Sequence, residues 1–491
     1  MMRSMTRAAE FAPATSAFMT RLATLARTYA KGGLDPTKPV AIRSHDALGV
    51  AARTAWYKGL PPNQLPAAPD AKFFPGLPPA GTKAVDAARV KIKGTTADSY
   101  WQGLGLWAMA GQPVTVTIPQ ALLRALPVGS APITLHIGGW TDNIYKDRAE
   151  FTRRPEMVRF YTVGSARTVI GSAFGGLIYI TLPEGLKLAD QTITVTWAIK
   201  APVMTEGMTA KQWAAVLAAS PAPWGEVVTS KLVISTPRSS LATVTDPVKL
   251  TKYWNAVMDS HAWMAGINAN RPSPMRIQHD QDIEFGYMHS GYPIMTFMDV
   301  VNSTLDTNGA HWGHYHELGH NHQDSAWTWE CVVEVTCNFF SARGMAAVRG
   351  FTDPANFYGW YDGNMEQRLQ DREKYFADGP DHKVLCDSPS LYLDSFLQLI
   401  EDGGYGFELL RDTIASYKNL SEEEMPQTDE EKIQTWVKQQ SKTAGCNFYE
   451  HYQQWGWPLL EVTKAALAEY PVCGNYDDYN KLIEAVEWTT V

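Results

Sequence analysis

Long apolar runs are absent from this sequence of 491 residues. A helix that crosses a membrane needs about 18 or more consecutive apolar residues, so the sequence predicts no transmembrane segment. Blocks of basic residues are absent as well, and 43 Lys and Arg against 51 Asp and Glu give a formal net charge of −8. A mildly acidic chain without a basic patch binds nucleic acid and anionic membranes poorly, which removes nucleic acid from the expected partners.

Closely spaced cysteine pairs are also missing. The chain has five cysteines and no Cys-x-x-Cys pattern, which excludes a zinc ribbon and a thioredoxin-type site. An odd number leaves at least one cysteine unpaired within a monomer. The first residues lack the apolar core of about 7–15 residues that a secretory signal peptide needs. Either the protein is cytoplasmic, or its export signal has been removed.

Aromatic residues, in contrast, are plentiful, with 17 Trp and 21 Tyr. Together with 45% hydrophobic residues, the length predicts several globular domains with large cores. We expect Trp101, Trp107, Trp455 and Trp457 to lie in these cores. A surplus of tryptophan is also typical of carbohydrate-binding surfaces, because flat rings stack on the C–H faces of sugars.

Three regions with different patterns follow one another along the chain. Residues 1–90 begin with a helical pattern, in which Phe18 and Leu22 share one face, and continue as a Pro-rich connector that cannot hold regular structure. Residues 95–205 contain short β-branched runs separated by Gly, Pro and Asn, which predicts a β-sandwich-like domain. Residues 206–491 are mainly helical. The sequence therefore predicts an α+β multidomain chain.

One short pattern carries chemistry: His316-Glu317-Leu318-Gly319-His320. On a helix, residues four apart lie on one face, so the two histidines can bind one Zn²⁺. Glu317 can then act as general base on the water that the metal activates. The alternative is a surface helix that happens to carry two histidines. Leu318 and Gly319 favour a buried helix packed closely against a neighbour.

A catalytic zinc site takes three protein ligands and a water, and the next predicted helix offers two glutamates. Glu330 and Glu334 lie four apart on one face, so either can return to the metal. The longer pattern HExxHxxGxxH needs glycine and histidine where this chain has Gln323 and Ala326. The residues alone leave Glu330 and Glu334 open.

The blocks around this pattern resemble the M60-like (enhancin-related) zinc metallopeptidases. HWGHYHELGHNHQ and EVTCNFFS carry the resemblance, and QPVTVTIP, ITLHIGGWTDN, FGGLIYITLP, APWGEVVTSKLVISTP and NFYEHYQQWGWPL extend it. The resemblance selects Glu334 as the third ligand and implies that Asn338, one turn later, supports a ligand histidine. It further implies a gluzincin-type catalytic domain behind a β-domain. Cys337 departs from the small polar residue expected there.

Several members of this family look like O-glycopeptidases, which cut the backbone of mucin-type proteins next to a glycosylated Ser or Thr. The resemblance thus implies one Zn²⁺ per chain on His316, His320 and Glu334, with Glu317 as the base and an O-glycosylated protein as the partner. Two alternatives are a general zinc endopeptidase and a non-catalytic glycoprotein-binding module. Because O-glycosylated mucins lie outside the cell, we expect a secreted, periplasmic or cell-surface protein.

Two stretches offer candidate substrate-binding residues. In IGGWTDN, Trp140 could stack on a sugar and Asp142 could accept hydrogen bonds from its hydroxyls, although a plain turn has the same sequence. In GYMHSGYPIM, Tyr287 and His289 combine polar side chains with a tight backbone. That combination is typical of an active-site edge strand, which binds extended peptide by β-augmentation. The alternative there is a buried strand and turn.

Overall fold

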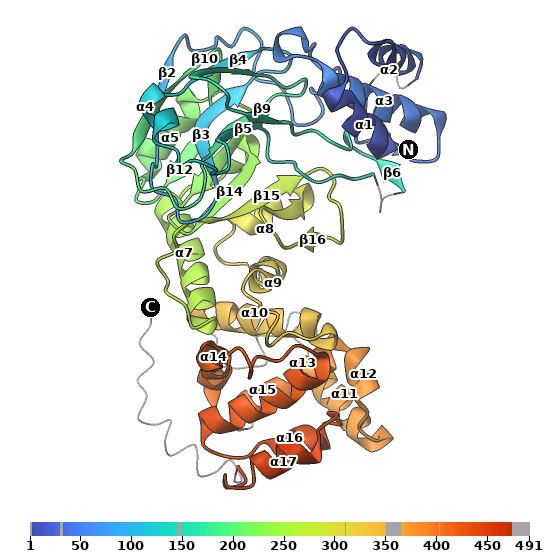
Figure 1. Cartoon of the computed structure of the whole chain (residues 1–491), viewed down its shortest axis with the longest axis vertical. Coiled ribbons are helices and arrows are strands. Elements are labelled where there is room, and N and C mark those ends of the chain that lie inside the picture. Colours follow the sequence, from blue (N-terminus) through green and yellow to red (C-terminus); the bar gives the residue numbers. More distant parts are fainter. Residues whose placement is uncertain are drawn as a thin grey trace. The chain divides into compact units, whose positions relative to one another are not determined.

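A computed structural model of the chain describes residues 2–29, 33–145, 149–309, 311–349, 365–401 and 403–473. Contacts divide the chain into two compact units, Met1–Lys252 with Arg271–Thr307 and Tyr253–Asn270 with Asn308–Val491. The described strands all belong to the first unit. The predicted α+β class, with a helical start, a β-rich middle and a helical end, is confirmed (Figure 1).

The first unit begins with helices α1 (Met2–Phe11), α2 (Ala17–Thr28) and α3 (His45–Gly59). Serine side chains begin two of them: Ser16 accepts the backbone N–H of Met19, and Ser44 accepts that of Ala47. Such caps satisfy backbone donors that have no partner inside the helix. The Pro-rich connector holds only the short 3-10 helix η1 (Pro62–Gln64).

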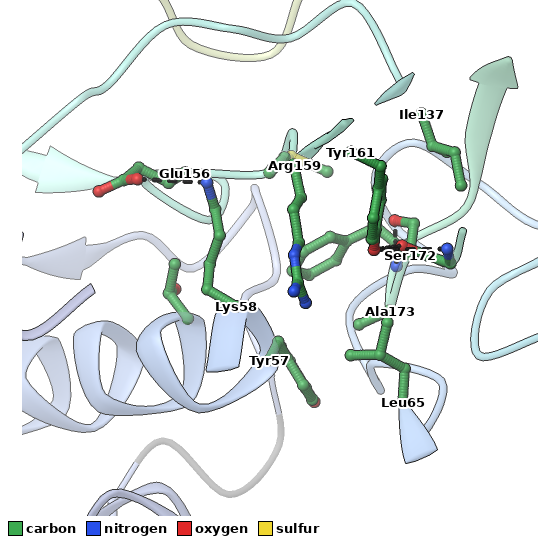
Figure 2. Close-up of a pocket in the computed structure, with 13 residues that line it drawn as sticks. Tyr57, Lys58, Leu65, Ile137, Glu156, Arg159, Tyr161, Ser172 and Ala173 are labelled. Atoms are coloured by element: carbon green, nitrogen blue, oxygen red, sulfur yellow. Dashed lines mark hydrogen bonds and ion pairs between the residues drawn. The ribbon is translucent and has the colours of Figure 1, made fainter. Parts of the chain in front are cut away.

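Residues at the end of α3 contact the β-rich part of the same unit. Figure 2 shows Lys58 extending toward Glu156, whose carboxylate lies 3.4 Å from Lys58 Nζ. The Arg159 guanidinium donates to the carbonyl of Leu60 at 2.7 Å. Apolar residues of both parts form one buried cluster that includes Met19, Leu22, Tyr57, Trp107, Phe174 and Tyr179. The N-terminal helices therefore share a core with the β-rich part.

Two antiparallel sheets form the β-sandwich-like part. The four-stranded sheet has the order β2 (Ala88–Ile92), β10 (Gln191–Thr196), β4 (Val114–Thr117), β8 (Arg167–Ile170). The five-stranded sheet has the order β11 (Ile199–Lys200), β3 (Trp101–Ala108), β9 (Gly176–Thr181), β5 (Thr134–Ile137), β7 (Phe160–Thr162). Alternate residues, such as Val114 and Val116 of β4 and Ile193 and Val195 of β10, enter one buried cluster, because side chains of a strand point to opposite faces in turn.

A six-stranded mixed sheet follows, which the sequence analysis did not predict. Its order is β12 (Val203–Thr205), β13 (Trp224–Val228), β14 (Leu232–Pro237), β15 (Met275–Asp280), β17 (Ile294–Phe297), β16 (Met288–His289). Strands β14, β15 and β17 run parallel to one another. All six residues of β15 are buried although four of them are polar, so the strand has neither a continuous apolar run nor a polar face exposed to solvent.

Short elements complete the first unit. They are β1 (Val40–Ala41), which pairs with β6 (Glu150–Phe151), and α4 (Gln120–Arg124), α5 (Ala210–Ala219), α6 (Arg238–Leu241), η2 (Met298–Val300) and α8 (Val301–Leu305). Helix α7 (Pro247–Met264) contributes residues to both units. The predicted boundaries 1–90, 95–205 and 206–491 stay a prediction, because contact-defined units need not coincide with domains read from sequence.

The described residues of the second unit form helices and no strands. Its elements are α9 (Trp312–His320), η3 (Glu330–Val332), α10 (Val333–Arg349), α11 (Met365–Asp378), α12 (His382–Cys386), α13 (Pro389–Glu401), α14 (Gly406–Ser416), η5 (Tyr417–Asn419), α15 (Asp429–Ala444), α16 (Tyr449–Gln454) and α17 (Glu461–Ala466). Disulfides join Cys331 to Cys386 and Cys446 to Cys473, which leaves Cys337 as the unpaired cysteine. No helix within the described residues has the length and apolar character to cross a membrane.

Candidate metal centre

Helix α9 presents the two histidines of the HExxH pattern on one face. The Nε2 atoms of His316 and His320 lie 3.0 Å apart, as the spacing of one helical turn allows. Oε2 of Glu334, the second residue of α10, lies 3.1 Å from Nε2 of His316 and 3.5 Å from Nε2 of His320. Three potential ligand atoms thus converge on one point.

Glu330, the other glutamate that the sequence left open, lies elsewhere. The group of ligand atoms within 4.8 Å of one another consists of His316, His320, Glu334 and Cys337. Glu330 belongs to η3, where its backbone N–H donates to Asp429 at 3.0 Å. The geometry therefore favours Glu334 over Glu330.

Amide side chains fix the orientation of both imidazoles. His316 Nδ1 lies 2.9 Å from Oδ1 of Asn338, and His320 Nδ1 lies 2.8 Å from Oε1 of Gln323. These amides are themselves oriented, because Asn338 donates to the carbonyl of Glu334 and Gln323 to that of Val333. An amide oxygen only accepts, so each Nδ1 carries the proton and each Nε2 presents a lone pair. This is the tautomer that a metal bound at Nε2 requires.

Asn338 occupies the place that the sequence analysis gave it, whereas Gln323 was not considered for this role. Gln323 lies just beyond the end of α9, three residues after His320. The available signal was its position one turn after a ligand histidine. Asp324, the next residue, accepts the backbone N–H of Ala326 instead.

Close packing of α9 against α10 brings the ligands together. Gly319 is buried, and a Cβ built on it would lie 2.2 Å from the carbonyl oxygen of Cys337. Any larger residue would push the two helices apart, which explains the glycine between the histidines. Cys337 itself is buried, its sulfur lies 3.5 Å from Nδ1 of His316, and burial raises the pKa of its thiol well above the usual value. Cys337 therefore packs beside His316 at the edge of the site.

Glu317 lies on α9 between the two histidines and is only 7% exposed. A carboxylate directly after the first histidine of such a helix is the group expected to exchange protons with a water at the metal. The donor set of two imidazoles and one carboxylate is also the kind that catalytic zinc takes, with one position left for water. The residues present therefore fit a zinc ion.

The predicted sugar-stacking role of Trp140 is wrong, because its ring is buried in the first unit. Trp140 is 2% exposed and packs against Phe74 and Trp224 at ring-centroid distances of 5.2 and 5.1 Å. Its indole N–H donates to the carbonyl of His279 at 3.1 Å. Gly138, with a positive φ of 86° and no side chain, leaves room for the indole ring. No face of this ring is open to a sugar.

Asp142 and His289 were predicted from separate stretches, and the structure brings them together. His289 Nε2 lies 2.8 Å from Oδ2 of Asp142, which also accepts the backbone N–H of Glu284 at 2.7 Å. His289 Nδ1 faces the carbonyl of Ser290 at 2.9 Å. Both ring nitrogens thus face acceptors, an arrangement that a doubly protonated imidazole satisfies. Buried Asp142 therefore anchors strand β16 and does not face a sugar hydroxyl as predicted.

Tyr287 lies directly before strand β16 and is 55% exposed. Strand β16 pairs with β17 on one side and is the edge of the six-stranded sheet. An edge strand presents unpaired backbone donors and acceptors that another extended chain can use. Tyr287 is thus accessible, and His289 is half-buried beside it.

The HExxH helix and the glutamate of the next helix form a candidate metal site. Family comparison agrees: residues 197–456 match peptidase M60, enhancin and enhancin-like, and residues 82–196 match the N-terminal domain of M60-like peptidases. The first match spans more than half of the chain, so this chain belongs to the peptidase M60 family.

Individual relatives and solved structures extend this comparison. TRPM8 channel-associated factor 3 of Rattus norvegicus is 30% identical over 403 residues, which cover 80% of this chain and 42% of the relative. A functionally unknown protein of Bacillus anthracis has a similar fold, with a TM-score of 0.62, 21% identity and 79% and 80% of the two chains covered. So does IMPa of Pseudomonas aeruginosa, solved in complex with an O-glycopeptide, with a TM-score of 0.53, 14% identity and 94% and 63% covered. The chain spans about two fifths of the length of the curated relatives it matches.

Proposed function

We propose that this chain is a zinc-dependent endopeptidase that cuts the backbone of mucin-type O-glycosylated proteins next to a glycosylated Ser or Thr. The observation that carries the proposal is the convergence of His316, His320 and Glu334 within 4.8 Å, with Glu317 buried between the histidines. Membership of the peptidase M60 family supports a metallopeptidase. The likeness to a fold solved with an O-glycopeptide supports the choice of substrate.

In this proposal one zinc ion per chain is held by Nε2 of His316, Nε2 of His320 and a carboxylate oxygen of Glu334. When bound, the ion supplies Lewis-acid chemistry, which makes a water more acidic and polarises a carbonyl. A Glu317 carboxylate oxygen takes a proton from the attacking water and passes it to the leaving amine. Asn338 and Gln323 hold the two imidazoles in the tautomer that leaves Nε2 free.

Residues beside strand β16 are the proposed contacts for the substrate. We assign part of the substrate contact to Tyr287 and His289, because Tyr287 is exposed beside an edge strand that can accept an extended peptide. Asp142 acts through His289, and Trp140 has no direct part.

The proposed substrate also implies that the protein is exported. The disulfides Cys331–Cys386 and Cys446–Cys473 support this, since such bonds persist in oxidising compartments.

A second candidate function is a non-catalytic binding protein. The observation that favours it is the name of the curated relatives, which describes association with the channel TRPM8. A binding protein has no use for a general base. Substitution of Glu317 therefore separates the two candidates.

The deciding experiment compares initial rates on one peptide with and without a core N-acetylgalactosamine on a single Thr, followed by mass spectrometry of the fragments. We expect cleavage of the glycopeptide beside that Thr and much slower cleavage of the bare peptide, because binding energy from the sugar positions the scissile bond. Equal rates on both would leave a general zinc endopeptidase. Cleavage of neither peptide by zinc-loaded protein would favour the binding protein.

Glu317→Gln provides the mechanistic arm of the same experiment. The variant should fold and keep its zinc but lose about 10²–10⁴-fold in rate, because only the proton acceptor is removed. Glu330→Gln is the matched control, since it changes an exposed glutamate outside the ligand group. A Glu317→Gln variant with normal turnover would contradict the proposed base.

A further inference from the structure

The side chain of Glu334 has few packing contacts that would hold it in place. Its side chain is 58% exposed, and it is the second residue of α10. The ends of helices open more readily than their interiors. If the first turn of α10 is in place for only a fraction of the time, the apparent metal dissociation constant rises in inverse proportion to that fraction. The metal affinity therefore depends on whatever holds the start of α10.

The segment before Glu334 is tied to other helices of the second unit. Trp329 is buried, and its indole N–H donates to the hydroxyl of Tyr392 on α13 at 3.2 Å. The backbone N–H of Glu330 donates to Asp429 of α15. The next residue, Cys331, is covalently bound to Cys386 at the end of α12.

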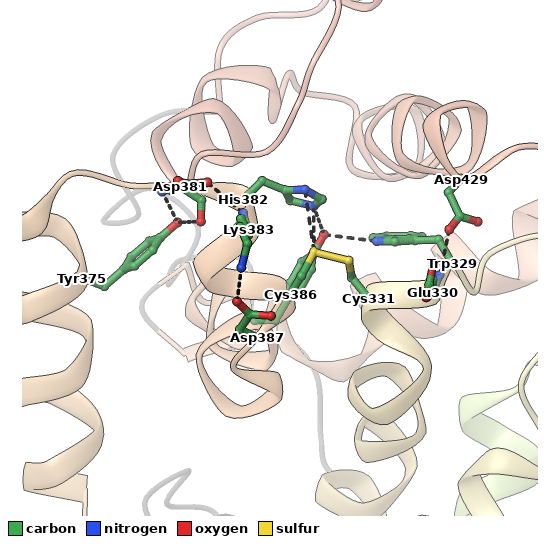
Figure 3. The surroundings of a disulfide bond; sticks show 11 residues. Trp329, Glu330, Cys331, Tyr375, Asp381, His382, Lys383, Cys386, Asp387 and Asp429 are labelled. Carbon is green, nitrogen blue, oxygen red and sulfur yellow. Dashed lines mark hydrogen bonds and ion pairs between the residues drawn. A yellow bond between two sulfur atoms is a disulfide. The ribbon is translucent and has the colours of Figure 1, made fainter.

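Figure 3 shows this disulfide between η3 and α12, with Trp329 and His382 near it. The α12 end of this disulfide is held by packing, because Leu385, the neighbour of Cys386, is fully buried. Cys331 stands three residues before Glu334, and η3 leads directly into α10. A covalent bond at this place limits how far the first turn of α10 can move from α12.

We propose that the Cys331–Cys386 disulfide positions Glu334 and thereby sets the metal affinity of the site. This inference rests on the proposed function, in which Glu334 is the third zinc ligand. Cys331 and Cys386 are positioning residues: neither binds the ion while the bond is intact. The structure thus assigns the two disulfides of the second unit different roles. Cys331–Cys386 maintains the metal centre, and Cys446–Cys473 stabilises the chain after α15 without bearing on the ligands.

The second disulfide supplies a matched control. Cys446 and Cys473 lie in the same unit and close a loop of 27 residues, against 55 for Cys331 and Cys386. Loss of either bond should lower the melting temperature, because both constrain the unfolded chain. Only loss of Cys331–Cys386 should change metal binding.

The experiment measures the zinc dissociation constant by competition with a chromophoric chelator, with melting temperature recorded in parallel. The double variant Cys331→Ala/Cys386→Ala should bind zinc about 10-fold more weakly or worse, as for loss of a group that orients a ligand. Cys446→Ala/Cys473→Ala should bind as the wild type does. An unchanged constant in the first variant overturns the inference. Wild-type protein that binds no zinc would instead contradict the proposed function.

Reduction provides a second route if the first variant does not fold. In folded Cys446→Ala/Cys473→Ala protein, Cys331–Cys386 is the remaining disulfide and can be reduced with a phosphine. The freed thiols are then alkylated, because Cys331, Cys386 and His382 lie close enough to form a metal site themselves. Weaker zinc binding after reduction supports the inference, and equal binding before and after overturns it.

Discussion

The sequence predicted the positions of the metal-centre residues in the second unit much better than those of the substrate-binding residues in the first unit. Ligand atoms of His316, His320 and Glu334 lie close together and Asn338 contacts His316, although the spacing alone predicted only the histidine pair and the family resemblance selected Glu334 and Asn338. Trp140, Asp142, Tyr287 and His289 do not form one surface: Trp140 is in the core, Asp142 anchors His289, and Tyr287 is exposed.

The difference follows from the range of the interactions. The two histidines lie on one helix and the glutamate on the next, so local helix geometry places most of the site. The exposure of Trp140 depends instead on Phe74 and Trp224, which are distant in sequence. Residue type and local pattern therefore predict a helix-borne site well and a loop-borne surface poorly.

The largest expected effect concerns Trp140. Trp140→Ala should lower the free energy of unfolding by about 3–5 kcal/mol, because it empties a buried aromatic site. Tyr287→Ala, at an exposed aromatic, should stay within about 0.5 kcal/mol of the wild type. Urea denaturation measures both. A stable Trp140→Ala variant that loses only glycopeptide cleavage would restore the sugar-stacking role. It would also contradict the conclusion that the sequence predicted this residue poorly.

Removal of the third ligand should have the next largest effect. Glu334→Ala should weaken zinc binding by more than the about 10–100-fold that loss of a ligand's hydrogen-bond partner costs. Glu330→Ala should leave the zinc dissociation constant unchanged, since Glu330 lies outside the ligand group. Zinc titration of the metal-free variants gives both values. If Glu330→Ala loses the metal and Glu334→Ala keeps it, the ligand assignment is wrong.

The hydrogen bond between Asn338 and His316 provides a second test of the metal centre. Asn338→Ala should weaken zinc binding about 10–100-fold, because His316 loses the acceptor that fixes its tautomer. Asn338→Asp keeps an oxygen acceptor and should bind zinc more tightly than Asn338→Ala does. Zinc dissociation constants of the two variants test this order, and equal constants would show that the acceptor has no role.

The smallest expected effect concerns Asp142. Burial raises the pKa of Asp142, but the hydrogen bond and charge of His289, the backbone N–H of Glu284 and the charge of Arg153 together outweigh it, so its pKa lies below the usual 3.8. A carboxylate with a lowered pKa stabilises the fold above its unfolded pKa and loses that contribution as the pH falls through its folded pKa. Asp142→Asn should therefore cost about 1 kcal/mol at neutral pH, and less below pH 3.8.

The measurement for Asp142 is the difference in unfolding free energy between wild type and Asp142→Asn at several pH values, since other groups also titrate. Asp282→Asn is a useful comparison, because Asp282 is another buried aspartate of the same unit and its carboxylate accepts a hydrogen bond from Thr152. A difference that stays constant from neutral to acidic pH would show that the Asp142–His289 pair is not ionic.

Much of the fold was also predictable, with one clear exception. The helices near residues 15–58 and the alternating strands of the β-rich middle have periodic patterns, and the structure contains them. The six-stranded sheet was missed because its central strand β15 is short and fully buried yet carries polar residues such as Arg276 and Gln278, so it does not read as the apolar run expected of a buried strand. Gln323 was missed because its role depends on contacts with Val333 and Thr336 of the next helix.

The sequence by itself determined the chemistry of the site: two histidines one turn apart, a glutamate between them, and a further glutamate in the next helix. It did so because an α-helix converts a spacing of four residues into a shared face. Only the tertiary structure decided between Glu330 and Glu334 on geometry, buried Trp140, and paired Asp142 with His289 across 147 positions of the chain. These outcomes depend on packing between distant segments, which no local pattern records.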